Sequence, residues 1–414
     1  MIIKNHGHKK AISRLGFYCS AVILAIALLS LNLIPGMAQD SQTVKVGVLH
    51  SLSGTMAISE VTVKNATLLA IQEINAAGGV LGKKIQPVVE DGASDPAIFA
   101  QKAQKLVEQD KVVTVFGGWT SASRKAMLPV FERFHSLLWY PVQFEGNECS
   151  ANIMYSGAQP NQQILPALDW AFEKGYKKIF LLGSDYVFPR TANLILKKHI
   201  VHGGGTVAGE EYVPLGGTDF SAVITKIKMA HPDVIFNTLN GDSNVSFFKQ
   251  AAAAGMPPSK LPVMSFSIAE QEAQAMGAQL VAGSYAAWNY FQSLPSPANK
   301  KFIAAYRAAF PGGNSAVDDP MAHGYIDVLT WAAAVNSAKS FDPNAVRKAA
   351  TQLPWDDSVM GLIKFAPNQS LYQTAYVAEL QPDGQFKILW KSKQPLLPEP
   401  YDPLAFPGKS CAVK

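Results

Sequence analysis

From Thr43 onward, short apolar runs alternate regularly with longer amphipathic stretches. The run TVKVGVLH at 43–50 has the length and composition of a buried strand, and the helical pattern at 61–79 ends in two glycines. The alternation continues with strand candidates at 85–91, 112–118 and 137–141, and with helix candidates at 95–109 and from Thr120. Because parallel neighbouring strands need a crossover between them, this order predicts right-handed βαβ units and a parallel sheet covered on both faces.

The same alternation resumes after residue 157. Helix candidates lie at 160–175, 189–204, 219–230 and 244–255, and strand candidates lie at 177–185, 206–213, 234–242 and 261–267. One sheet would need too many strands, and 414 residues exceed what a single core usually serves. The sequence therefore predicts two similar α/β lobes.

The pattern changes beyond Ala286. Two long helix candidates, 297–310 and 319–338, are followed by strand candidates at 361–367 and 374–390, the latter a hairpin that turns at Asp383–Gly384. The stretch 395–410 is too rich in proline for a helix or a sheet, so we expect a tail that runs over the surface.

The first 38 residues have the order of an export signal. Lys4, Lys9, Lys10 and Arg14 precede a long apolar run, and Gly36 and Ala38 stand at the −3 and −1 positions of a small-residue cleavage site. The alternative is an uncleaved membrane anchor, since about 20 apolar residues can span a bilayer. The signal order favours cleavage and a mature chain that begins near Gln39.

The net charge of +5 comes mostly from this segment, which contains no Asp or Glu. Without its four basic residues, 32 basic side chains face 31 acidic ones. A nearly neutral mature chain gives no electrostatic support for binding nucleic acid.

Two cysteines remain after the signal, Cys149 and Cys411. In an exported protein they can form a disulfide, and the alternative is two free thiols, one of them near the C-terminus. A bond closing so long a loop would stabilise the fold by about 4–5 kcal/mol at most.

Polar and aromatic side chains gather where the predicted strands end. The stretch GGWTSASRKAMLPVF at 117–131 joins a strand to a helix and brings an aromatic side chain, hydroxyls and free backbone N–H groups together. In open parallel sheets ligands bind beyond these strand ends. The candidate ligand-binding residues are Trp119, Thr120, Ser121, Tyr140, Gln143, Tyr186, Phe188, Asn240, Asp242 and Trp288.

Taken singly, each of these residues is as readily explained as a helix cap or a turn residue; Asp242, for example, opens a helix. Together they offer aromatic faces, hydroxyl donors and few carboxylates, without a strong positive charge. That combination favours a small, uncharged, planar ligand that forms hydrogen bonds.

Signatures of catalysis are weak. The stretch GSDY at 183–186 lacks the second glycine of a nucleophile elbow, and GGGTVAG at 203–209 follows a helix candidate where a dinucleotide site follows a strand. The histidines show no metal-ligand spacing. We expect no catalytic residue, no cofactor and no metal site, and an enzyme on this scaffold is disfavoured.

Several stretches also match a known family in order and without large gaps. They are VKVGVLHSLSGTMAISE, AIQEINAAGGVLGKKIQPVVEDGASDP, GGWTSASRKAMLPVFE, WYPVQFEGNECSANIMYSGAQPNQQILPALDW, GSDYVFPRTAN, FNTLNGDSNVSFFKQ, SFSIAEQE and AAWNYFQSL. From about Val44 to Tyr401 the chain resembles the urea-type substrate-binding proteins of ABC transporters. The wider family includes branched-chain amino acid binding proteins and a cytosolic short-chain amide sensor.

The resemblance implies an α/β type I periplasmic binding protein with two Rossmann-like lobes joined by a hinge of three crossovers. The implied N-terminal lobe is 43–156 plus 289–340, the C-terminal lobe is 157–288 plus 341–395, and 396–414 form the surface tail. The implied location is the periplasm. The implied partners are the permease and ATPase subunits of an importer, with membrane contact only through the permease.

The resemblance also implies ligand contacts. Those of the amide sensor carry over to Ser121, Tyr140 and Tyr186, and to Trp119 and Phe188, where the sensor has tyrosine. The sensor has threonine and proline where this chain has Val142 and Gln143, which implies a different hydrogen-bonding pattern.

Urea fits the candidate residues chemically. Ser121 and the free N–H groups at its helix start can donate to the carbonyl, and oxygens of Gln143, Asn240 and Asp242 can accept from the amides. The alternatives are a short-chain amide or a branched-chain amino acid as ligand of the same fold. For an amino acid, Asp242 could bind the ammonium group, but no clamp for the carboxylate is evident. The export signal argues against a cytosolic amide sensor.

Overall fold

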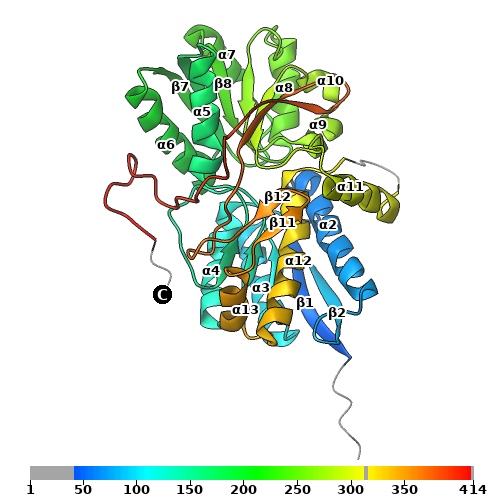
Figure 1. The fold of residues 1–414 in the computed structure, drawn as a ribbon. Helices are drawn as coiled ribbons and strands as arrows, with labels where there is room; N and C mark the ends of the chain where they lie inside the picture. Colours follow the sequence, from blue (N-terminus) through cyan, green and yellow to red (C-terminus); the bar gives the residue numbers. More distant parts are fainter. Residues whose placement is uncertain (1–41, 312–315, 412–414) are drawn as a thin grey trace, which may run out of the picture. The chain divides into compact units, whose positions relative to one another are not determined.

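Five parallel strands form the first sheet of the computed structural model, which describes residues 42–311 and 316–411 (Figure 1). The strand order is β2-β1-β3-β4-β5, and β1 pairs with β2 along its whole length, from Thr43 opposite Lys84 to His50 opposite Asp91. The bounds are β1 Thr43–His50, β2 Lys84–Asp91, β3 Val115–Gly117, β4 Leu138–Tyr140 and β5 Ile153–Tyr155. The predicted signal at 1–38 lies outside the described residues.

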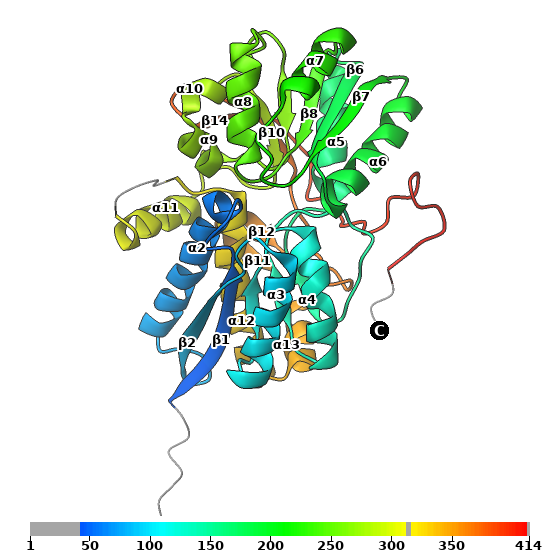
Figure 2. The ribbon, with the colours of Figure 1, turned by 180° about the vertical axis from the view of Figure 1, so that it is seen from behind.

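Helices cover both faces of this sheet. The helices that connect its strands are α2 Ala57–Ala76, α3 Pro96–Gln104 with a π-helical turn at Lys105–Gln109, and α4 Ser121–Arg133. Figures 1 and 2 show α3 and α4 together on one face and α12 (Asp319–Ala338) on the other, where α12 packs against α2. The predicted start of the helix candidate 95–109 is confirmed, because Asp95 caps α3 by accepting hydrogen bonds from the amides of Ala97 and Ile98.

The second sheet has seven strands in the order β14-β13-β10-β9-β8-β6-β7. Its bounds are β6 Lys178–Ser184, β7 Thr206–Val213, β8 Val234–Thr238, β9 Val263–Ser265, β10 Tyr285–Trp288, β13 Tyr376–Leu380 and β14 Phe386–Lys391. Strands β6 to β10 run parallel, and β13 and β14 add an antiparallel hairpin. The predicted turn is confirmed: Gly384 has a φ of 81°, and its amide donates to the carbonyl of Gln381.

Both faces of the second sheet are buried. On β6, Phe180 and Leu182 belong to one core cluster, whereas Ile179 and Leu181 belong to another on the opposite face. The helices of this part are α5 Ile164–Glu173, α6 Val187–His202, α7 Ser221–Ala230, α8 Ser243–Ala253, α9 Glu270–Met276 and α10 Ala278–Val281, after a 3₁₀ turn at Pro160–Gln162. Consecutive strand residues therefore feed two hydrophobic layers, as a doubly covered sheet requires.

From Thr43 on, the chain forms one compact unit with two lobes, and the predicted α/β two-lobed fold is confirmed. The chain crosses between the sheets near 156–163, 289–296 and 371–375. Among the described residues, no helix is both long enough and apolar enough to cross a membrane.

The segment 341–395, which the sequence assigned as a whole to the C-terminal lobe, is divided between the two cores. Helix α13 (Pro343–Ala350) packs against α12, and Val346 and Leu371 belong to the core cluster of the first sheet. Strands β13 and β14 join the second sheet. The apolar face of α13 determines this placement, because α12 lies beside it and covers it. We therefore propose a lobe boundary near residue 372.

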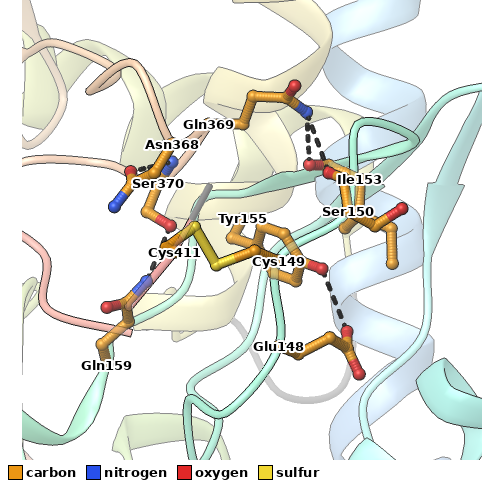
Figure 3. Close-up of a disulfide and its surroundings, with 10 residues drawn as sticks. All are labelled: Glu148, Cys149, Ser150, Ile153, Tyr155, Gln159, Asn368, Gln369, Ser370 and Cys411. Atoms are coloured by element: carbon orange, nitrogen blue, oxygen red, sulfur yellow. Dashed lines mark hydrogen bonds between the residues drawn. A yellow bond between two sulfur atoms is a disulfide. The ribbon is translucent and has the colours of Figure 1, made fainter. Parts of the chain in front are cut away.

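The remaining elements belong to the first lobe, because Phe302, Tyr306 and Ile363 lie in the core cluster of the first sheet. These elements are α11 Pro297–Ala309, β11 Trp355–Ser358 and β12 Gly361–Ile363, the two strands forming a small separate hairpin. Cys149 and Cys411 are joined in a disulfide with their Cα atoms 5.8 Å apart, so the structure has the bonded alternative (Figure 3).

Gly117, at the end of β3, lies where β3 approaches β1 closely. Its φ is +144°, and a Cβ added there would lie 1.9 Å from the carbonyl oxygen of Leu49 in β1. Gly117→Ala is expected to lower the unfolding free energy by roughly 2–4 kcal/mol, from the left-handed backbone and the clash together. Thermal unfolding of the wild type and the variant measures this loss.

Gly175→Ala is the matched control. Gly175 also has a positive φ, +86°, but nothing lies within 4 Å of an added Cβ. Only the backbone penalty applies there, about 1–2 kcal/mol. Equal losses in the two variants would mean that the close approach of β3 to β1 contributes nothing.

Candidate functional site

The candidate site begins where β3 ends and α4 starts. Gly117 and Gly118 both have positive φ, and Thr120 caps the helix by accepting from the amide of Ser123 at 3.1 Å. The Thr120 hydroxyl oxygen therefore has a structural partner. Ser121 follows as the first helical residue and is 1 % exposed. A buried hydroxyl thus stands at a helix N-terminus, beside amides that have no partner within the helix.

The two lobes meet across this point. Trp119 donates its indole N–H to Asn240 Oδ1 at 3.0 Å, from the end of β3 to the end of β8. Gln143 donates its amide to the carbonyl of Phe266 at 2.8 Å. At the rim, the amide of Asp242 donates to Thr55. These contacts join the first lobe to the second, so the structure is a closed form of the two lobes.

Arg124 lies under the site and is fully buried, one helical turn after Ser121. Its Nη1 donates to Ser121 Oγ at 3.0 Å, its Nε donates to Glu148 at 2.7 Å, and its Nη2 donates to Glu145 at 3.1 Å. Its guanidinium also lies over the ring of Tyr140, 4.9 Å from the centroid. Each nitrogen of this guanidinium therefore has a protein partner.

The charges of this cluster shift one another's titration. Burial raises the pKa of Glu148, but the nearby Arg124 and Lys125 outweigh burial and bring the pKa to about 2. Burial lowers the pKa of Arg124, and Glu148 and Glu145 more than reverse this, so its pKa lies well above the ordinary value. At neutral pH the cluster is an ionised network with both signs of charge.

Several buried polar atoms around this network have no hydrogen-bond partner among the described residues. They include His50 Nε2, Glu60 Oε1, Gln143 Oε1 and Glu145 Oε2. The Tyr186 phenol lies near them: burial raises its pKa well above the usual range, and Tyr140, Glu145 and Glu60 raise it further. Buried polar groups are nearly always paired in folded proteins, so these unpaired buried atoms make this region a candidate place for a ligand or water.

The structure places the predicted site residues in different surroundings. Ser121, Tyr140 and Tyr186 come together near Arg124, whereas Gln143 donates to Phe266 and Ser267 of the second lobe and Thr120 caps α4. Trp119 and Asn240 pair across the cleft, so their polar atoms already have a partner. Phe188 and Trp288 are 3 % and 1 % exposed and pack in the core clusters of the second lobe, and Asp242 is exposed at the start of α8.

The expectation of a site without a strong positive charge is wrong, because the buried guanidinium of Arg124 contacts both Ser121 and Tyr140. Sequence reasoning also missed Glu145 and Glu60; Glu60 accepts from the amide of Ser51 at 2.9 Å and contacts His50. One signal was available: Arg124 stands three residues after Ser121, which places the two on one helix face. The sequence could not show that the loop after β4 returns two carboxylates to it.

Comparison with known proteins identifies the family. Residues 44–405 match the model of the periplasmic binding protein domain, so the chain belongs to the periplasmic binding proteins. Proteins of this family serve as the solute-binding components of ABC transporters. These components bind the transported molecule and are not enzymes. A relative from Brucella suis, named Leu/Ile/Val-binding protein homolog 7, is 26% identical over 389 residues, 88% of this chain and 96% of the relative.

Solved structures share the fold. A periplasmic binding protein from Burkholderia mallei has a TM-score of 0.77 at 20% identity, covering 90% of this chain and 99% of that one. A solute-binding protein from Rhodopseudomonas palustris in complex with 4-hydroxybenzoate has a TM-score of 0.75 at 24% identity, covering 86% and 98%. A Streptococcus pneumoniae protein in complex with isoleucine has a TM-score of 0.73 at 23% identity, covering 84% and 99%.

Arg124→Met is the sharpest test of the buried network. The substitution leaves Glu145 and Glu148 buried without their main cation, so we expect the unfolding free energy to fall by roughly 3–5 kcal/mol. Lys125→Met is the control, since Lys125 contacts the same two carboxylates from a side chain that is 36% exposed. Its loss should cost about 1 kcal/mol or less. Thermal unfolding that ranks the two variants equally would contradict the buried role of Arg124.

The low pKa of Glu148 predicts an acid-sensitive contribution to stability. Because the folded-state pKa is about 2 and the ordinary value is 4.5, the contribution is present above pH 4.5 and is lost as the pH falls toward 2. The loss amounts to roughly 3 kcal/mol. The Glu148→Gln variant should be less stable than the wild type at neutral pH. Its melting temperature should also change less than that of the wild type as the pH falls through this acid range. Parallel curves for the two proteins would exclude this role.

Proposed function

We propose that this chain is the solute-binding component of an ABC importer and that it captures urea between its two lobes. The observation that carries the proposal is a pair of buried, unpaired acceptor oxygens, on Glu145 and Glu60, near Tyr186 and Tyr140. Among the described residues, Gln143 Oε1 is a further buried oxygen without a partner. Such a site calls for a ligand that is rich in N–H groups and small enough to be enclosed.

Urea meets these demands. It has four N–H bonds for the acceptor oxygens and one carbonyl for donors such as the Ser121 hydroxyl and the amides at the start of α4. Tyr140 and Tyr186 supply aromatic surface that excludes water, which strengthens hydrogen bonds in the site. A ligand that left one of these groups unpaired would lose roughly 1–3 kcal/mol of binding free energy.

The same site disfavours carboxylate ligands. Benzoates and amino acids bring an anionic group that needs a clamp, and Arg124 already donates to Glu145, Glu148 and Ser121. An added carboxylate would also meet the unpaired oxygens of Glu60 and Glu145, which repel it. Short amides remain the nearest alternative, but formamide and acetamide have only one NH2 group each.

The remaining parts of the proposal follow from export and closure. The segment 1–38 directs the chain to the periplasm and is cleaved near Gln39. Closure over the ligand creates the surface that the permease recognises, and the ATPase subunits then drive uptake. In this proposal, interlobe contacts such as Trp119–Asn240 form as the lobes close over the ligand.

Calorimetry on the mature chain, residues 39–414, tests the ligand. We expect heat of binding with urea, weaker binding with formamide and acetamide, and none with leucine or benzoate. The physical reason is the match between four N–H donors and the unpaired acceptors. Binding of leucine without binding of urea would overturn the ligand assignment while leaving the transport class in place.

Ser121→Ala tests the donor side of the site. Removing the hydroxyl leaves the ligand carbonyl with one donor fewer and should weaken urea binding at least about tenfold. Ser123→Ala is the control, because Ser123 is a buried serine of the same helix whose hydroxyl bonds to Thr120. Its affinity for urea should stay unchanged. Equal affinities in wild type and Ser121→Ala would remove Ser121 from the site.

A further inference from the structure

The C-terminal tail, residues 392–411, is held on the second lobe over much of its length. Leu396 exchanges backbone hydrogen bonds with Gln373, and Asp402 contacts His199 of α6 at 2.8 Å. Ala405 and Phe406 pack against the core cluster beneath α5 and α6. Figures 1 and 2 show the tail leaving the strands of the second lobe and running down beside the junction of the two lobes.

The same tail is bound to the first lobe at two points. The carbonyl of Pro400 accepts from the amide of Asn147 at 2.6 Å, and Cys411 is bonded to Cys149. Gly146 allows the first contact, because its φ is +70° and an added Cβ would lie 2.2 Å from the Pro400 oxygen. Next to Cys149 in the chain, Glu148 accepts from the hydroxyl of Tyr155 at 3.0 Å (Figure 3).

Both attachment points belong to the loop that carries the candidate site. This segment, residues 143–149, is called the ligand loop here. Gln143 and Glu145 hold the unpaired acceptor oxygens, and Glu148 pairs with Arg124. From the other side, Gln369 donates to the carbonyls of Ser150 and Ile153, just after the ligand loop (Figure 3).

We propose that the disulfide-bonded tail is a covalent strap between the lobes that positions the ligand loop and limits how far the lobes open. Cys149 and Cys411 are positioning residues in this proposal, since they act on the ligand through Glu145 and Gln143. The three hinge crossovers allow the lobes to rotate apart. The strap adds a fourth connection, outside the hinge, between α6 of the second lobe and the ligand loop of the first.

The consequence is preorganisation. A ligand-free protein that opens less loses less conformational freedom when it closes, and a fixed ligand loop keeps its acceptors in place. Removal of the disulfide should therefore increase the population of ligand-free molecules with open lobes. The apparent affinity should fall, because a smaller fraction of the molecules is in the conformation that binds the ligand.

The double variant Cys149→Ser/Cys411→Ser removes the bond without leaving a free thiol. Small-angle X-ray scattering of the ligand-free mature protein should show a larger radius of gyration than the wild type. Calorimetry should show urea binding that is weaker by roughly threefold to tenfold. An unchanged radius of gyration together with an unchanged affinity, even with a lower melting temperature, would mean that the disulfide only stabilises the fold. That result would overturn the proposal.

Two further variants separate the strap from general stability. His199→Ala keeps the disulfide but removes the contact of the tail with α6, so it should also enlarge the ligand-free radius. Val346→Ala destabilises the core of the first lobe away from the tail and should leave both radius and affinity unchanged. A Val346→Ala protein that opens like the double cysteine variant would contradict the strap.

The inference rests on the proposed function only in using urea as the probe. The scattering measurement needs no ligand, so it decides the strap even if urea fails to bind. In that case a larger radius in the double cysteine variant still supports the strap, and only the ligand assignment falls.

Discussion

The buried ion pair between Arg124 and Glu148 connects the parts of the site. Arg124 belongs to α4, and Glu148 belongs to the ligand loop, which has no regular secondary structure of its own. A buried guanidinium needs compensation by opposite charge and hydrogen bonds, and the loop supplies both. The requirement runs in both directions, because the carboxylates of the loop are equally buried. The position of the loop, and with it Glu145, therefore depends on this ion pair together with the contacts of Lys125 and the attachments of the C-terminal tail.

Closure of the lobes depends on polar contacts that differ from those of the cores. Each sheet has its own hydrophobic layers, but across the cleft the chain uses single hydrogen bonds such as Trp119–Asn240 and Gln143–Phe266. Water can replace such bonds when the lobes separate, whereas an apolar interface would resist opening. Reversible closure is thus compatible with two rigid lobes.

The crossover at 289–296 shows how the hinge is kept in order without regular structure. Asp319, at the start of α12, accepts from the amides of Asn289 and Tyr290 at 2.8 Å, and Glu270 accepts from the amide of Gln292 at 2.6 Å. Burial raises the pKa of Glu270 to about 8 even though this amide favours its ionised form. Carboxyl groups therefore supply the hydrogen-bond acceptors that a neighbouring strand would otherwise provide for this segment, which crosses between the two sheets.

The sequence predicted the fold well because strand and helix periods are local properties. The two lobes, the Asp95 cap and the Asp383–Gly384 turn all follow from short-range patterns. The placement of α13 in the first lobe did not follow, because its packing against α12 is a tertiary contact that no local pattern encodes. The ligand-binding residues stay a prediction. The strand ends suggested Ser121, Tyr140 and Tyr186, which the structure brings near Arg124, but the partners of Arg124 lie in a loop whose return path no local pattern encodes.

This difference also changes the physical reason for expecting a neutral ligand. Composition suggested a cleft without cations, but the structure has a cation whose nitrogens are occupied by Glu145, Glu148 and Ser121. A site without a cation disfavours anionic ligands, and so does a site whose cation has protein partners at every nitrogen. The two kinds of site differ in the ligand groups that they favour. Arg124 orients Glu145 with one oxygen unpaired, and an oriented carboxylate favours N–H donors. Under the proposed function, selectivity for a ligand rich in N–H groups comes from how the charges in the site are paired, and Arg124 is part of that pairing.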